Sequence, residues 1–235
     1  MFLLKKILLG VLMVGILSAP CVFAGGEKVD SGTLKGKFMC DYQGWFRTLD
    51  DGAGMGWNHY SRIRNEITPQ SLVIDMWPDL SDFDEKDKVP VPGFRHADGS
   101  QAYLVSGHNP VVIDTHFRWM KQYDIDGAWY QHFLVGFKDG EDGVGYRSRR
   151  QNMLWVKQAA QKHGRVWAIC FDTAGVKENE KIPARIIDEW KRLVDEGVTT
   201  GEDYLKENAL PVVHVWGLFY SDANNHLRPE QAAQV

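Results

Sequence analysis

Cysteine, positive charge and long hydrophobic runs are all scarce in this sequence. Three cysteines in 235 residues do not make a disulfide framework, and Cys40 and Cys170 each lie in an apolar run where a buried free thiol is expected. The 27 lysines and arginines are outnumbered by 31 aspartates and glutamates, so the chain lacks the basic excess of nucleic-acid-binding proteins. The sequence is therefore atypical of disulfide-rich proteins, and we expect no nucleic-acid partner.

Hydrophobic residues are concentrated near the N-terminus, from Ile7 to Ala19. Lys5 and Lys6 precede this run and a small-residue cleavage site ends at Ala24, which is the pattern of a secretory signal peptide. The run is shorter than the ~20 residues of a membrane-spanning helix. We expect cleavage of residues 1–24 to leave 25–235 as one exported domain, periplasmic or extracellular, with no stable membrane span. A retained membrane anchor is the alternative.

Motifs for metals and nucleotides are also missing. The eight histidines include no His-Glu-x-x-His spacing and have no close cysteine partner, so we expect no metal site. The glycine-rich segment from Asp50 to Gly56 is followed by Trp57-Asn-His-Tyr60 rather than by a helix, which disfavours a phosphate-binding turn. We therefore expect no cofactor.

Aromatic side chains, in contrast, are abundant. The sequence has nine tryptophans, eight tyrosines and eleven phenylalanines. Such rings fill cores, and in proteins that bind sugars they also stack on the apolar faces of pyranose rings. The composition is thus compatible with an oligosaccharide or polysaccharide partner.

Strand-like and helix-like segments alternate along the chain. Four short runs rich in β-branched and aromatic residues are bounded by Gly, Pro or Asp and predict strands over residues 37–42, 127–133, 166–171 and 211–216. Helices are expected from Asn109-Pro110 onward, from Arg149 to His163 with a stop at Gly164, and from Pro183 to Gly197. This order predicts parallel βαβ units in an α/β fold.

The repeated units favour a (β/α)8 barrel of the TIM-barrel type over a doubly wound sheet. The first unit carries a long excursion from Tyr42 to Asn109, and such loops gather on the catalytic face of a barrel. About four units are present, and Arg228-Pro229 opens a fourth helix. We therefore expect a barrel truncated to about half.

Several motifs resemble a known family. They are Gly44-Trp-Phe-Arg47, Gly54-Met-Gly-Trp-Asn-His-Tyr60, Ile74-Asp-Met-Trp-Pro-Asp79, Gly93-Phe-Arg-His96 and Gly127-Ala-Trp-Tyr-Gln-His132. They look like the N-terminal half of bacterial proteins related to the endo-α-mannosidase family, glycoside hydrolase family 99, which include xylosidase/arabinosidase-like proteins. The similarity runs from about Lys37 to Tyr220.

The resemblance implies a barrel that hydrolyses glycosidic bonds of glycans with two glutamates three residues apart. No such pair follows a strand here, and Glu178 and Glu180 lie in a charged linker. The catalytic residues are thus unknown. We expect a glycoside hydrolase-like protein that is inactive as this chain alone, with a non-catalytic carbohydrate-binding protein as the alternative.

Strand alternation nominates the binding residues. In the third run Ala168, Cys170 and Asp172 share one face, and small residues suit a barrel interior. The same register on the other runs brings Tyr42, His132, Asp172 and Trp216 to one rim. A second set of candidates is Trp45, Trp129, Gln131 and His214. The alternatives are packing for Tyr42, a core role for His214 and turn capping for Asp172.

Overall fold

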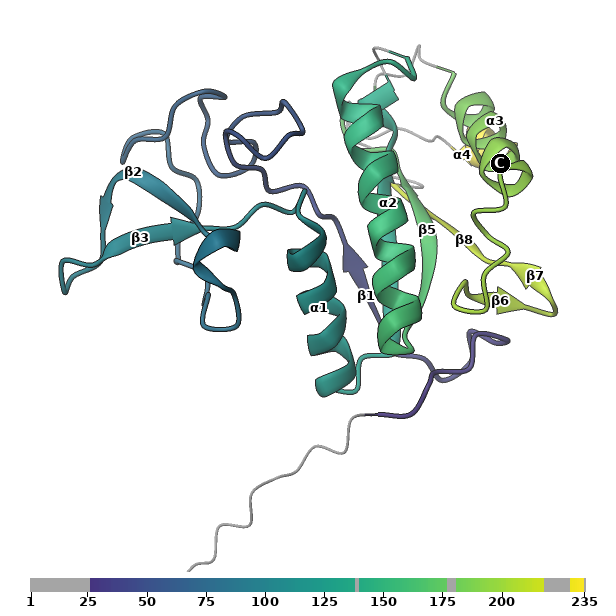
Figure 1. The fold of residues 1–235 in the computed structure, drawn as a ribbon. Coiled ribbons are helices and arrows are strands. Elements are labelled where there is room, and N and C mark those ends of the chain that lie inside the picture. Colours follow the sequence, from purple (N-terminus) through teal and green to yellow (C-terminus); the bar gives the residue numbers. More distant parts are fainter. Residues whose placement is uncertain (1–25, 138–139, 177–180, 218–228, 235) are drawn as a thin grey trace, which may run out of the picture.

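The computed structural model describes residues 26–137, 140–176, 181–217 and 229–234, and a parallel sheet is its main element (Figure 1). The strands lie in the order β1 (Met39–Tyr42), β4 (Gly127–Phe133), β5 (Val166–Asp172) and β8 (Val213–Trp216). Every neighbouring pair is parallel. The predicted α/β class and the four predicted strands are therefore confirmed, with β1 and β8 shorter than expected.

Three helices connect these strands: α1 (Pro110–Gln122), α2 (Val144–His163) and α3 (Ile182–Asp195). The side chain of Asn109 accepts a hydrogen bond from the Val111 amide at 2.8 Å and so caps α1. Gly164 ends α2 in the left-handed conformation, with φ of 62°. The start of α1 and the end of α2 were both predicted, whereas α2 begins before the predicted start at Arg149. The shorter helices are η1 (Glu85–Asp87), η2 (Leu134–Phe137) and α4 (Pro229–Ala232).

The main core lies between the helices and one face of the sheet, here called the helix face. Side chains of α1 and α2, among them Phe117 and Met153, join Tyr130 and Ile169 in one buried cluster. Figure 1 shows α1 and α2 side by side in front of the strands. Burying this many apolar side chains is the main source of the fold's stability.

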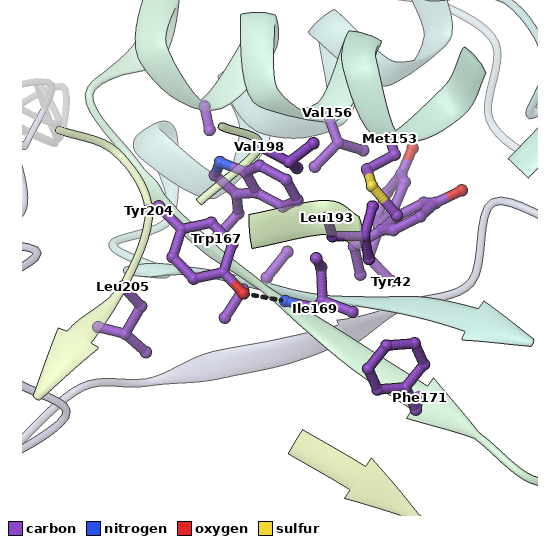
Figure 2. Close-up of a cluster of buried hydrophobic side chains, with 14 of the residues drawn as sticks. Tyr42, Met153, Val156, Trp167, Ile169, Phe171, Leu193, Val198, Tyr204 and Leu205 are labelled. Atoms are coloured by element: carbon purple, nitrogen blue, oxygen red, sulfur yellow. Dashed lines mark hydrogen bonds between the residues drawn. The ribbon is translucent and has the colours of Figure 1, made fainter. Parts of the chain in front are cut away.

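Trp167 anchors the same core at the start of β5. Its ring is fully buried and packs edge-to-face on Tyr204 with 5.0 Å between centroids (Figure 2). The indole nitrogen donates to the Asp203 carboxylate at 2.8 Å, and the Tyr204 hydroxyl accepts from the Ile169 amide at 3.2 Å. At least this tryptophan is a core residue with its polar atom satisfied.

The excursion between β1 and α1 folds around a small core of its own. It contains the antiparallel pair β2 (Val89–Arg95) and β3 (Gln101–Leu104). Trp57, Tyr60 and Val91 pack together in it, and the Tyr60 hydroxyl donates to the Val105 carbonyl at 2.9 Å. A second antiparallel pair, β6 (Lys206–Glu207) and β7 (Leu210–Pro211), precedes β8.

The described strands form an open sheet. No barrel is seen in these parts of the chain, because β1 and β8 lie at the two ends of the strand order and do not pair with each other. The structure thus confirms the α/β class and leaves the barrel type as a proposal.

Candidate functional site

A cavity of about 410 Å³ opens at the carboxyl end of β1, between the excursion and the first half of α1. Six ring-bearing residues line it: Tyr42, Trp45, Phe46, Tyr60, Trp77 and His116. We call this site the aromatic cavity. Three of the motifs that carry the family resemblance contribute to its wall. The first provides Gly44, the second Tyr60, and the third Ile74 and Pro78.

A neutral hydrogen-bonded pair forms part of the cavity wall. The Tyr42 hydroxyl lies 2.9 Å from Nδ1 of His116. Burial lowers the pKa of His116 to about 4 and raises the pKa of Tyr42. Both groups are therefore uncharged at neutral pH. Neutral groups of this kind can donate hydrogen bonds to ligand hydroxyls and accept them from ligand hydroxyls, and no charge has to be buried when the ligand binds.

The other rings differ in how much of their surface is engaged. Trp45 is stacked on His59 with 4.3 Å between centroids and on Phe133 with 5.3 Å. Trp77 contacts Phe94 and His96 only in T-shaped geometry, so no described ring lies parallel to it. Trp77 is thus the indole best placed to stack on a ligand.

The pairing register separates the four residues expected at one rim. Tyr42 pairs with Tyr130, which pairs with Ile169, so these side chains lie on the helix face. His132 pairs with Phe171 and lies there too. Phe133, Asp172 and Trp216 form the matching row on the other side of the sheet, here called the second face. The prediction of a single rim is therefore wrong, because the assumed register of β1 and β4 was off by one residue.

His132 is buried completely rather than presented at an edge. Its Nε2 lies 2.9 Å from Oε1 of Glu189 on α3, which also accepts from the Tyr146 hydroxyl at 3.3 Å. Burial holds the pKa of His132 well below its usual range, so the bond to Glu189 is that of a neutral imidazole donating to a carboxylate. This geometry is that of a core network joining β4 to α3.

The remaining nominated residues share the second face. Gln131, Cys170 and His214 form one row across β4, β5 and β8, and Trp129 packs on His214 with 5.2 Å between ring centroids. Oε1 of Gln131 and Nδ1 of His214 are buried without a hydrogen-bond partner among the described residues. Five of the residues nominated from the sequence therefore lie on the second face: Trp129, Gln131, Asp172, His214 and Trp216.

Asp172 is tied to the turn after β5. Its Oδ1 accepts from the Ala174 amide at 2.7 Å, as the capping alternative predicted. Burial raises the pKa of this carboxyl, and Asp41 on the same face adds to the increase. Trp216 pairs with Asp172 in the sheet register.

A second cavity, of about 360 Å³, was missed by the sequence reasoning. Arg62, Arg64 and Arg149 line it together with Asn58 and Ser61, and the first two residues of α2 also contribute to the wall. We call it the arginine cavity. The signal that could have indicated it is the Arg-x-Arg spacing directly after the Tyr60 motif. His116 was also missed, although it lies in the predicted first helix.

The described ranges contain no group of three or more His, Cys, Asp or Glu side chains arranged to hold a metal ion. No helix in this part of the chain is both long and apolar enough to cross a membrane. Cys40 and Cys170 are free thiols, and burial raises the pKa of Cys170 to about 12, so this sulfur is not a ready nucleophile.

Comparison with known proteins adds no relative: neither the protein-family models nor the curated protein sequences contain a match to this chain.

Proposed function

We propose that this protein binds a glycan in the aromatic cavity, as an exported α/β protein of the (β/α)8 barrel type related to glycoside hydrolase family 99. The observation that carries the proposal is the composition of the cavity wall. Indole, phenyl and phenol rings surround a volume of about 410 Å³, and the neutral Tyr42–His116 pair lies among them. Flat rings with a few placed hydrogen-bonding groups are what a sugar ring requires.

The described residues support glycan binding rather than hydrolysis. Hydrolysis of a glycosidic bond needs two carboxyl groups placed on either side of the bond. No aspartate or glutamate lines the aromatic cavity among the described residues. The carboxylate nominated from the sequence, Asp172, lies on the second face and accepts a hydrogen bond from the Ala174 amide. This favours the carbohydrate-binding alternative for the described part of the chain.

The test is a glycan array probed with the mature protein, followed by calorimetric titration of the glycans that bind. Trp77→Ala should weaken binding about tenfold, equivalent to ~1.4 kcal/mol, because a stacking surface is lost. Phe38→Ala removes an exposed ring outside the cavity and should leave affinity unchanged. Equal affinities of wild type and Trp77→Ala for every bound glycan, or no bound glycan at all, would refute the proposal.

A further inference from the structure

The arginine cavity has an unbalanced charge. Three guanidinium groups line it, those of Arg62, Arg64 and Arg149, and no carboxylate is among the described residues that line it. Arg64 donates to the Gly54 carbonyl. Among the described residues, none of the three arginines forms an ion pair with an acidic side chain. The Asp172 carboxyl attracts Arg149, although it does not line the cavity. Like charges brought together repel each other, and an anion bound between them would relieve that repulsion.

The start of α2 adds to this positive potential. Val144 and Gly145, the first two residues of the helix, line the cavity. No side chain caps this end, and the first turn contains no acidic residue. The first amides of a helix lack intrahelical acceptors, and the helix dipole places partial positive charge there.

Arg149 is the most constrained of the three arginines. Its guanidinium lies over the Phe133 ring with 4.6 Å to the centroid, and its buried Nε has no hydrogen-bond partner in the part of the chain that the structure describes. Burial lowers the pKa of Arg149 to about 10, which leaves it protonated at neutral pH. An added Cβ at Gly136 would lie 2.8 Å from this Nε, so the glycine gives the guanidinium its space. A buried cationic donor without an acceptor is costly unless a ligand supplies one.

The two cavities have no lining residue in common, but residues of their walls are in contact. The Asn58 side chain lines the arginine cavity and donates to the Trp45 carbonyl at 3.3 Å, and Trp45 lines the aromatic cavity. The Phe133 ring contacts both the stacked ring of Trp45 and the guanidinium of Arg149. Phe133 and Asn58 therefore connect the aromatic cavity to the arginine cavity.

We propose that the ligand is an acidic glycan, whose carboxylate or sulfate ester is bound in the arginine cavity while a neighbouring sugar ring occupies the aromatic cavity. This inference rests on the proposed glycan binding and adds the charge of the ligand to it. Guanidinium groups recognise both anions by paired hydrogen bonds, so the shared chemistry is that of an oxyanion.

The experiment compares matched glycans on the mature protein by calorimetric titration. One pair is an oligouronide and its carboxyl-reduced counterpart, and the other is a sulfated oligosaccharide and its desulfated counterpart. We expect at least one acidic member to bind tenfold or more tightly than its neutral partner. Its affinity should fall as salt is raised, because screening weakens charge attraction at an open cavity. The pair that shows the preference identifies the anion.

The variant for this test is Arg62→Gln with Arg64→Gln. Both arginines are exposed, so their loss is not expected to unfold the protein. We expect the double variant to bind the acidic glycan as weakly as its neutral counterpart. The control, Lys35→Gln with Lys191→Gln, removes the same charge from exposed positions outside both cavities and should keep the preference.

The outcomes separate the two proposals. Neutral glycans that bind as well as acidic ones, with Trp77→Ala still weakening them, would overturn the acidic ligand and keep glycan binding. A preference that survives in the double arginine variant would overturn the role of the arginine cavity. Failure of every glycan to bind would overturn both.

Discussion

At the scale of single residues, the difference between a predicted and an observed role can be one position in a strand. His132 was nominated for sugar binding because strand alternation was expected to place it on the same face as Asp172, but Phe133 is the residue that aligns with Asp172. The alternation rule was right for β5, where small and large side chains mark the two faces. It could not fix the faces of β1 and β4, since their sequences mix large residues on both sides.

His132 therefore tests the correction. His132→Ala should destabilise the protein by about 3 kcal/mol, because it leaves a cavity and removes a donor to the buried Glu189. Glycan affinity of the folded fraction should not change. Urea denaturation measures the free energy of unfolding, and calorimetric titration measures the glycan affinity. Trp77→Ala is the comparison variant, because it should weaken glycan affinity. A loss of affinity without a loss of stability would restore His132 to the binding site.

His116 should make stability depend on pH. Its pKa falls from 6.5 to about 4 on folding because it is buried, so between these values the unfolded chain binds the extra proton. Stability should decrease as the pH falls through this window. His116→Gln should reduce the difference in unfolding free energy between pH 7 and pH 5 by about 2 kcal/mol. His96→Gln, at an exposed histidine, should not; an unchanged slope in His116→Gln would contradict the assignment.

At the scale of helices and strands, the sequence predicted helix ends correctly where a capping residue determines the end. Asn109-Pro110 and Gly164 are such caps, and both ends lie where they were expected. The start of α2 was missed because Gly143 provides no side-chain cap and glycine is common in its neighbourhood. A helix end without a cap leaves little trace in a sequence.

Gly164→Ala should cost about 1 kcal/mol of stability, since an alanine is strained in the left-handed conformation. The new Cβ would also lie 3.3 Å from the Lys28 Cα, which adds to the cost. Gln161→Ala, an exposed change in the last turn of the same helix, is the matched control and should be near neutral. Thermal unfolding of the two variants provides the comparison, and equal midpoints would argue against strain at the cap.

At the scale of the whole molecule, the order of strands and helices could be read from the sequence, whereas the cavities could not. Four predicted strands and three predicted helices are present in parallel βαβ order. The aromatic cavity combines residues from β1, the excursion and α1 that are far apart in the chain. Hydrophobic periodicity is local, so it does not show which distant loops meet.

The N-terminal segment lies outside the described residues, and its prediction remains open. If residues 1–24 are a secretory signal peptide, the exported protein should begin at Gly25. N-terminal sequencing or the intact mass of material recovered from outside the cytoplasm checks this. Retention of Met1 in that material would show that the segment is not cleaved.

The strand order also has a kinetic consequence. Within the parallel sheet, each strand pairs with the member of that sheet that comes before it in the chain, so the sheet extends at one edge as synthesis proceeds. The two strand pairs close chain loops of different length. A hydrogen bond next to the β4–β5 pair joins residues 40 positions apart, and a hydrogen bond next to the β1–β4 pair joins residues 88 positions apart. Closing the longer loop costs roughly 0.6 kcal/mol more in chain entropy. We therefore expect β4, α2 and β5 to form the nucleus, with β1 and the aromatic cavity completed after the rate-limiting step.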